Sequence, residues 1–394
     1  MIRRACIPIG FTWSSPFVRW QGSLAELPTI DLAADVTTRA LQQRRLPPEQ
    51  LSSIVLGTTI PNPGLFYGAP TVAARIGAPG ITGPMVSQAC ATGVAVAHAA
   101  ALEIETGNDG LVLGISADRL SNSPLLVYPS GAGVGGSPTS EHWLLQAMAK
   151  DPWAGASMLT TAELVAAESG ATRQELDDVT LQRYEQYEQA LADDRSFQRR
   201  YMVSVHVPGR KGETVVDADE GVHPTTPEGL AKLAPVLPDG LLTYGSQTHP
   251  ADAAAGMVVT TEERARELSG EGLVRLLGFG FARVAKAEMP KAAVPAAQSA
   301  LHAAGMSMED VDLVTTHNPF VVNDTWFSQQ TGFPLDRMNA YGCSLIYGHP
   351  HSATGTRAIA ELIEALRLRG GGVGLFTGCA AGDTGGSVVL RVED

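Results

Sequence analysis

The sequence predicts an α/β fold built from two similar halves. Segments 91–117 and 353–379 align without a gap, and each begins with Ala-Thr-Gly. Each continues as an Ala/Leu/Ile-rich stretch typical of a buried helix, turns at glycines, and enters a short apolar run typical of a buried strand. Their separation is far longer than a solenoid period. The repeat therefore indicates two copies of one α/β unit, the first interrupted by a long insertion.

Composition supports a globular chain and excludes some partners. The chain has 394 residues, of which 44% are hydrophobic and 18% charged, which favours two or three domains. The net charge of −13 argues against general affinity for nucleic acid or acidic membranes. No apolar run is long enough to span a membrane, and residues 1–10 resemble an opening strand more than a signal peptide.

Cysteine usage indicates a reducing compartment. The four cysteines are too few and too widely spaced for a disulfide scaffold, and they stand at positions 6, 90, 343 and 379. We therefore expect a cytoplasmic protein.

The predicted insertion covers residues 121–244, between an N-terminal half at 1–120 and a C-terminal half at 245–394. It contains a Gly/Pro/Ser-rich stretch at 129–138 and a charged helical segment from Thr172 to Arg200. We expect a solvated excursion that covers one face of the core and includes a lid. A separate linker domain is the alternative.

The C-terminal half has a clear order of elements. Residues 251–259 are small and apolar, and Thr261 is a candidate N-cap for a helix that ends at Ser269. The remaining predicted elements are a strand at 273–281, a helix at 292–305, a strand at 311–316 and a closing strand at 387–392.

Candidate catalytic residues lie at mirrored positions just before the two Ala-Thr-Gly sequences. Cys90 follows an apolar strand and precedes a helix, whose N-terminal N–H groups can lower a thiol pKa and hold an oxyanion. His349, between Gly348 and Pro350, stands at a nearly corresponding place in the second copy. In a structure with two similar halves, the starts of the two corresponding helices often converge on one crevice. A cysteine and a histidine that meet there can form a thiolate near neutral pH. An inert buried cysteine and a structural histidine are the alternatives.

Two further segments carry candidate residues. Cys379 ends the second strand of the repeat and precedes a glycine-rich loop, and His317-Asn318-Pro319-Phe320 follows the strand at 311–316. His317 and Asn318 could hold a water or polarise a carbonyl, although Asn-Pro is also an ordinary turn signal. Zinc bound by Cys90, His349 and Cys379 lacks the usual short ligand spacing, and a cysteine hydrolase lacks an evident orienting Asn or Asp.

Together these segments resemble the thiolase family, acyltransferases that cleave or form 3-oxoacyl-CoA. The most specific match is Gly348-His349-Pro350, followed by Ala353, Gly355 and Arg357. The other matches are Cys90 in Gln-Ala-Cys-Ala-Thr-Gly, Cys379 with Gly382 and Gly385, Ser116–Pro124, Thr161–Glu163, Asp177-Asp178, Asp219-Glu220 and Leu230–Leu233. The resemblance covers almost the whole chain and implies a layered αβαβα arrangement with an inserted loop domain that covers CoA.

The resemblance also implies a role for each catalytic residue. Cys90 would be acylated, His349 would take its proton, and Cys379 would shuttle a second proton. His317 replaces the Asn of the family's Asn-Glu-Ala-Phe box and would hold a water. The N–H groups of Cys90 and Ala381 would form an oxyanion hole, with Ala381 in place of the usual Gly.

Contacts to CoA are implied for Ser157, Met158, Thr248 and Phe320. Arg210 and Lys211 are candidate nucleotide-phosphate contacts, with ordinary surface charges as the alternative. CoA thioesters would be substrates, and no metal or redox cofactor is implied.

The resemblance thus predicts cleavage of 3-oxoacyl-CoA or the reverse Claisen condensation, in a homodimer or homotetramer. One alternative is a condensing enzyme with another acyl donor, which usually lacks the second cysteine. The other is a non-catalytic subunit that binds acyl-CoA or acts as a scaffold. The presence of Cys90, His349 and Cys379 together favours the enzyme.

Overall fold

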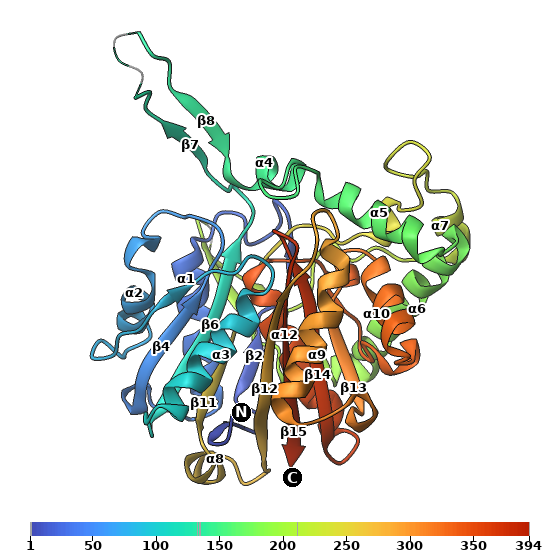
Figure 1. The fold of residues 1–394 in the computed structure, drawn as a ribbon. Helices are drawn as coiled ribbons and strands as arrows, with labels where there is room; N and C mark the ends of the chain where they lie inside the picture. The colour runs from blue at the N-terminus through green and yellow to red at the C-terminus, as the bar shows by residue number, and fades with distance from the viewer. Residues whose placement is uncertain (1, 132, 134, 211, 394) are drawn as a thin grey trace.

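One mixed sheet of eleven strands organises the protein (Figure 1). The computed structural model describes residues 2–131, 133, 135–210 and 212–393. The strand order is β13-β14-β15-β12-β1-β11-β6-β4-β5, with β2 and β3 paired to β11 beside this path. Strand β1 (Ala5–Pro8) pairs with both β11 (Ala251–Thr261) and β12 (Leu273–Arg283), and so joins the sheets of the two halves.

The structure confirms the predicted repeat. Helix α3 (Thr92–Glu105) leads into β6 (Leu111–Arg119), and α12 (Ser352–Arg367) leads into β14 (Gly372–Ala380). The two helices touch near their starts, because a Cβ added to Gly93 would lie 2.6 Å from the backbone nitrogen of Thr356. The Ala-Thr-Gly sequences therefore allow a close helix crossing that bulkier residues would prevent.

The N-terminal half combines parallel strands with covering helices. Strand β4 (Leu51–Gly57) runs parallel to both β6 and β5 (Met85–Val86). Helix α1 (Thr29–Gln43) buries Ile30, Ala33, Thr37 and Leu41, a helical spacing that directs one apolar face to the core. The other elements are β2 (Thr12–Ser14), β3 (Val18–Arg19) and α2 (Gly68–Arg75).

The predicted elements of the C-terminal half are confirmed to within a few residues. Thr261 caps α8 by accepting a hydrogen bond from the Arg264 N–H at 3.4 Å. Strand β13 extends through His317, one residue beyond the expected end. The elements are α8 (Glu262–Leu268), α9 (Ala293–Ala304), β13 (Leu313–His317), α10 (Val322–Thr331), α11 (Ser344–Tyr347) and β15 (Thr384–Glu393).

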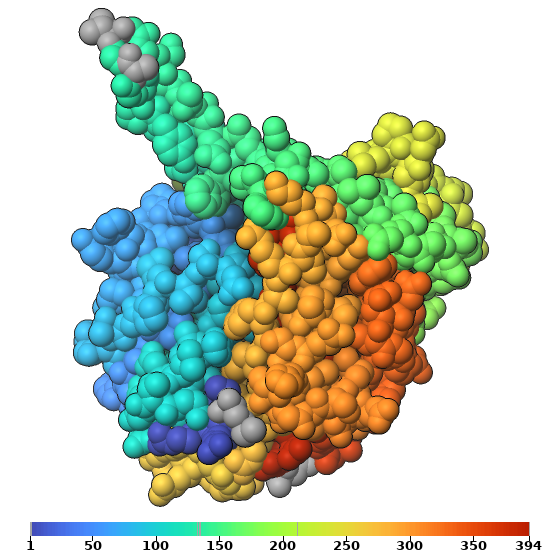
Figure 2. Space-filling model, in the orientation of Figure 1, coloured from blue at the N-terminus to red at the C-terminus, as the bar shows by residue number. Residues whose placement is uncertain are grey.

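In the described part of the chain, segment 121–244 adds no strand to the large sheet. A hairpin of β7 and β8 projects from the body, and α4 and α5 run across the top of both halves (Figures 1 and 2). The elements of segment 121–244 are β7 (Leu125–Tyr128), β8 (Thr139–His142), α4 (Trp143–Ala149), α5 (Met158–Ser169), α6 (Arg173–Arg195), β9 (Val205–Gly209), β10 (Gly212–Val216) and α7 (Pro227–Ala231).

The domain boundaries remain a prediction. Strand β11, which the sequence division assigns to the C-terminal half, is hydrogen-bonded to β6 of the N-terminal half. The charged helix ends at Arg195 instead of Arg200, and residues 192–194 already leave helical geometry.

The expectation of a solvated insertion is wrong for one side of α6. Arg183 is fully buried and pairs with Asp324 of α10 at 2.7 Å. Asp219, also from the insertion, pairs with the fully buried Arg357 of α12 at 2.6 Å. Charges taken out of water need partners, so these pairs fix the insertion to the C-terminal half.

No helix among the described residues has the length and apolarity needed to cross a bilayer.

Candidate active site

Cys90 lies in a sharp turn immediately before α3. Ala89 has φ +45°, a conformation unfavourable for a residue with a side chain. The Thr92 hydroxyl holds this turn by accepting from the Gln88 N–H at 2.8 Å and donating to the Ala89 carbonyl at 2.6 Å. The predicted strand–cysteine–helix arrangement is therefore present, although the strand is only Met85–Val86.

His349 meets Cys90, as the mirrored positions predicted. Its Nε2 lies 3.1 Å from the Cys90 Sγ, and its Nδ1 lies 2.7 Å from the Thr354 hydroxyl oxygen. The preceding Gly348 has φ +99°, and a Cβ there would lie 2.8 Å from the His249 Nε2. Only glycine fits this turn, which places the imidazole against the thiol.

The resting pair is neutral, contrary to the lowered thiol pKa expected from the sequence. Burial raises the pKa of Cys90 to about 11, although the backbone N–H groups of Ala381 and Cys90 lower it in part. Burial, with His317 and His351 nearby, holds the pKa of His349 well below its ordinary value. A helix start is too weak to offset desolvation here. Thiolate formation must therefore accompany substrate binding or attack.

His317 stacks on His349, with ring centroids 4.0 Å apart. The Ser344 hydroxyl donates to the Asn318 Oδ1 at 3.1 Å, so it accepts from the His317 Nδ1, also at 3.1 Å. The proton is therefore on Nδ1 and the lone pair is on Nε2. That Nε2 is buried and has no hydrogen-bond partner among the described residues. It can accept a hydrogen bond from a bound water or ligand.

The structure also brings Cys379 to the site. Burial raises the pKa of its thiol, and the nearby Cys90 raises it further when that thiol is ionised. The Asn323 Nδ2 donates to the Cys379 sulfur at 3.1 Å, and the Asn323 Oδ1 accepts from the Phe320 N–H at 3.2 Å. Sequence reasoning missed Asn323, whose only signal was its place in the first turn after the His317–Phe320 box.

A cavity of about 340 Å³ opens onto the Cys90–His349 pair. It is lined by Cys90, His349 and Ala381, together with all four residues predicted to contact CoA: Ser157, Met158, Thr248 and Phe320. Further apolar lining comes from Leu120, Leu144, Leu145, Met148, Leu159 and Met289. A mainly apolar cavity with a thiol in its wall suits a substrate that carries an apolar chain and a thioester.

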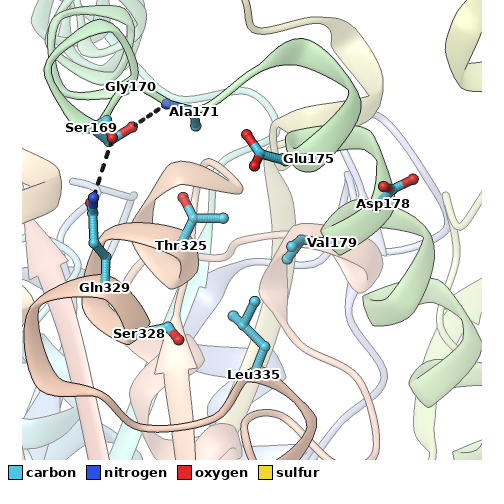
Figure 3. Close-up of a pocket in the computed structure, with 10 residues that line it drawn as sticks. All are labelled: Ser169, Gly170, Ala171, Glu175, Asp178, Val179, Thr325, Ser328, Gln329 and Leu335. Carbon is cyan, nitrogen blue, oxygen red and sulfur yellow. Dashed lines mark hydrogen bonds between the residues drawn. The ribbon is translucent and has the colours of Figure 1, made fainter.

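The close-up in Figure 3 shows a different hollow, of about 440 Å³, between α5, α6 and α10. Its lining includes Glu175, Asp178 and Gln329, but no cysteine or histidine. Neither cavity is lined by the exposed Arg210, and Lys211 lies outside the described residues.

A metal ion could find donors at this site. Each of three side chains offers one ligand atom, and these atoms all lie within 4.8 Å of one another: Cys90, His317 and His349. One thiol and two neutral imidazoles are donors that zinc accepts. A metal held there would occupy both the thiol and the base, so it would compete with chemistry at Cys90. The absence of a metal cofactor remains a prediction.

A thiol and an imidazole meet near the starts of two symmetric helices, in the wall of a mainly apolar cavity, within a duplicated α/β architecture. Such a site is typical of enzymes that use cysteine as a nucleophile. The comparisons with known proteins specify this class. The family models for the thiolase N-terminal and C-terminal domains match residues 11–263 and 271–392. The chain therefore belongs to the thiolase family of acyltransferases.

Similar proteins match nearly the whole chain. The acetyl-CoA acetyltransferase of Chromobacterium violaceum is 30% identical over 378 residues, 94% of this chain and 95% of its own. The crystal structure of human mitochondrial 3-ketoacyl-CoA thiolase superposes with a TM-score of 0.90 at 25% identity, covering 100% of both chains. A structure of that human protein in complex with CoA also gives 0.90, at 24% identity, covering 99% of this chain and 98% of its own. The thiolase fold predicted from sequence is confirmed.

The buried histidines predict a loss of stability in mild acid. Burial lowers the pKa of His317 from 6.5 to about 3, so the folded state stays neutral there while the unfolded state takes up a proton below pH 6.5. Stability is therefore complete above pH 6.5 and falls as the pH drops toward 3. We expect His317 alone to remove about 2 kcal/mol between pH 7 and pH 5.

Urea unfolding at both pH values measures this loss. The variant His317→Asn should lose less stability than the parent over the same interval. If the parent and the variant lost the same free energy of unfolding between pH 7 and pH 5, His317 would not be the source of the acid sensitivity.

Proposed function

We propose that the protein cleaves 3-oxoacyl-CoA to acetyl-CoA and a shortened acyl-CoA, or catalyses the reverse condensation, through an acyl-enzyme on Cys90. The observation that carries this proposal is the 3.1 Å contact between the Cys90 Sγ and the His349 Nε2 at the cavity wall. The relatives named acetyl-CoA acetyltransferase and 3-ketoacyl-CoA thiolase support it, as does the human thiolase solved with CoA.

In the first half-reaction, the Cys90 proton moves to the His349 Nε2 as the sulfur attacks the 3-oxo carbonyl carbon. The bond between C2 and C3 then breaks, leaving the acyl group on Cys90 and an enolate of acetyl-CoA. The N–H groups of Cys90 and Ala381, which already face the sulfur, would hold the oxygen of the tetrahedral intermediate. One such donor is typically worth about 3–4 kcal/mol.

The enolate needs a proton, which Cys379 would supply. Its high pKa suits a thiol that stays protonated until a strong base is present. A water on the His317 Nε2, together with His349, would hold the enolate oxygen. In the second half-reaction, the thiol of free CoA gives its proton to the Cys379 thiolate and attacks the acyl carbon. The Cys90 thiolate leaves and takes its proton back from His349. CoA is a substrate throughout.

The alternatives fit the site less well. A condensing enzyme with another acyl donor has no need for a second thiol, yet Cys379 lies near enough to Cys90 for the two to interact electrostatically. A non-catalytic subunit has no need for a hydrogen-bonded Cys–His pair. We further expect a homodimer or homotetramer, which light scattering after size exclusion would identify.

The direct test is CoA-dependent thiolysis of acetoacetyl-CoA and longer 3-oxoacyl-CoAs, followed by loss of enolate absorbance. Cleavage that requires CoA supports the proposal. Purified, folded protein that cleaves none of them would favour the non-catalytic alternative.

The variant Cys379→Ala should lose most of its thiolysis activity but keep the transfer of an acyl group to Cys90. Because the enolate depends on Cys379 for its proton, kcat for thiolysis should fall about 10²–10⁴-fold. A CoA thiolate is a far weaker base than an enolate and can leave without that proton. Transfer of a labelled acetyl group from acetyl-CoA to Cys90 should persist, as mass spectrometry of the intact protein would show. Loss of both activities in a folded variant would contradict this role.

A further inference from the structure

The turn between β14 and β15 consists of Ala381, Gly382 and Asp383. It carries the Ala381 N–H, which faces the Cys90 sulfur. Gly382 has φ +79° and Asp383 has φ +57°. A residue with a side chain rarely adopts this left-handed conformation, so contacts from outside the turn must hold it in place.

One of these contacts comes from Asp151, a residue of the insertion that is 2% exposed. Its Oδ2 accepts a hydrogen bond from the Gly382 N–H at 2.7 Å. Its Oδ1 accepts from the N–H groups of Trp153 and Ala154, at 2.7 and 2.9 Å. Hydrogen bonds to a carboxylate are stronger than those between neutral groups. Asp151 therefore joins the loop that follows α4 to the turn that carries the Ala381 N–H.

Trp153 holds this loop against the chain that follows β12. The Arg283 guanidinium and the Lys286 ammonium lie 4.0 and 4.6 Å from the centre of the Trp153 ring, within the range of a cation–π contact. The same stretch of chain reaches the turn from its other side, where the Ala287 N–H donates to the Asp383 Oδ2 at 3.0 Å. The turn is thus held between two segments that are distant in sequence.

The loop that begins at Asp151 also leads to the catalytic cavity. The Asp151 N–H donates to the Ala156 carbonyl at 2.9 Å, and the Asp151 carbonyl accepts from the Gly155 N–H at 2.7 Å. The loop is therefore closed on itself immediately before Ser157 and Met158, which line the cavity. One side chain thus connects the cavity wall predicted to contact CoA with the predicted oxyanion hole.

We propose that Asp151 is a positioning residue for the oxyanion hole. Through the Gly382 N–H it holds the turn so that the Ala381 N–H points at the oxygen of the tetrahedral intermediate. This inference rests on the proposed function and adds a residue to it. Asp151 does not line the catalytic cavity, so it acts through the turn and not on the substrate.

The test compares two reactions of Cys90 in the variant Asp151→Ala. Acetylation of Cys90 by acetyl-CoA passes through a tetrahedral oxyanion, whereas iodoacetamide alkylates the sulfur by displacement of iodide and forms none. Because complete loss of an oxyanion-hole donor typically costs about 10²–10³-fold, a displaced donor should slow acetylation about 10- to 100-fold at saturating acetyl-CoA. Alkylation should keep the parental rate. Intact-protein mass spectrometry of quenched samples measures both rates.

Two further variants complete the experiment, with thermal melting used to verify folding. Asp151→Asn keeps the volume and one acceptor oxygen, so its acetylation rate should lie between those of the parent and Asp151→Ala. Asp178→Ala is the matched control, because Asp178 is an exposed carboxylate of the insertion that accepts from the Gln174 Nε2 at 2.8 Å. Its acetylation rate should equal that of the parent.

Two results would overturn the role of Asp151. One is parental acetylation in both Asp151 variants, and the other is an equal loss of acetylation and alkylation, which would indicate general damage to the site. A parent protein that cleaves no 3-oxoacyl-CoA and accepts no acetyl group would instead remove the proposed function itself, and this inference with it.

Discussion

The variant Cys90→Ala should lose about four orders of magnitude in kcat for 3-oxoacyl-CoA thiolysis. Removal of a nucleophile eliminates the covalent route, and only binding and the oxyanion-hole donors remain to assist the reaction. The acyl-enzyme mass shift produced by labelled acyl-CoA should disappear at the same time. Initial rates at saturating substrate and intact-protein mass spectrometry would measure the two effects.

A matched control distinguishes the nucleophile from a general need for thiols. Cys6 is also buried, but it lies in β1, away from the cavity. Cys6→Ala should therefore keep kcat and the mass shift near parental values. An acyl adduct that survives in Cys90→Ala would show that another residue is acylated.

The variant Arg357→Met should lower the free energy of unfolding by about 3–5 kcal/mol. Arg357 is fully buried and donates to both Asp219 carboxylate oxygens, at 2.6 and 2.9 Å, and to the Glu361 Oε1 at 2.9 Å. Its guanidinium also lies 3.7 Å from the centre of the Tyr347 ring. Methionine fills much of the volume but leaves two buried carboxylates without their cation.

Urea unfolding monitored by circular dichroism would measure this loss. The control Arg264→Met removes an ion pair with Glu267, in which the two side chains are 41% and 51% exposed. Water already screens that pair, so the control should cost less than about 1 kcal/mol. Similar small losses in both variants would show that the buried network is not needed for stability.

Local patterns predicted the repeat and most elements of the C-terminal half, because these depend on residues close in sequence, such as the Ala-Thr-Gly helix starts and the Thr261 cap. The contact between Cys90 and His349 joins distant residues, and it could be predicted only because the repeat places both near the starts of symmetric helices. The thiolase resemblance also led to the cavity-lining residues Ser157, Met158, Thr248 and Phe320.

Other features could not be predicted, because they depend on contacts between distant parts of the chain. The Asn323–Cys379 hydrogen bond and the Arg183–Asp324 ion pair join residues that no local pattern relates. The high pKa of Cys90 follows from how completely the fold removes water, which helix-start chemistry does not reveal.

The touching starts of α3 and α12 have an evolutionary consequence. At the offset that aligns the two copies, Cys90 corresponds to Ser352 and His349 corresponds to Ser87. An assembly of two identical subunits about an exact symmetry axis would need both cysteine and histidine in each copy, and it would form the contact twice. Fusion in one gene lets each copy mutate independently, so that a single thiol faces a single imidazole. Covalent duplication therefore permits the division of labour between Cys90 and His349.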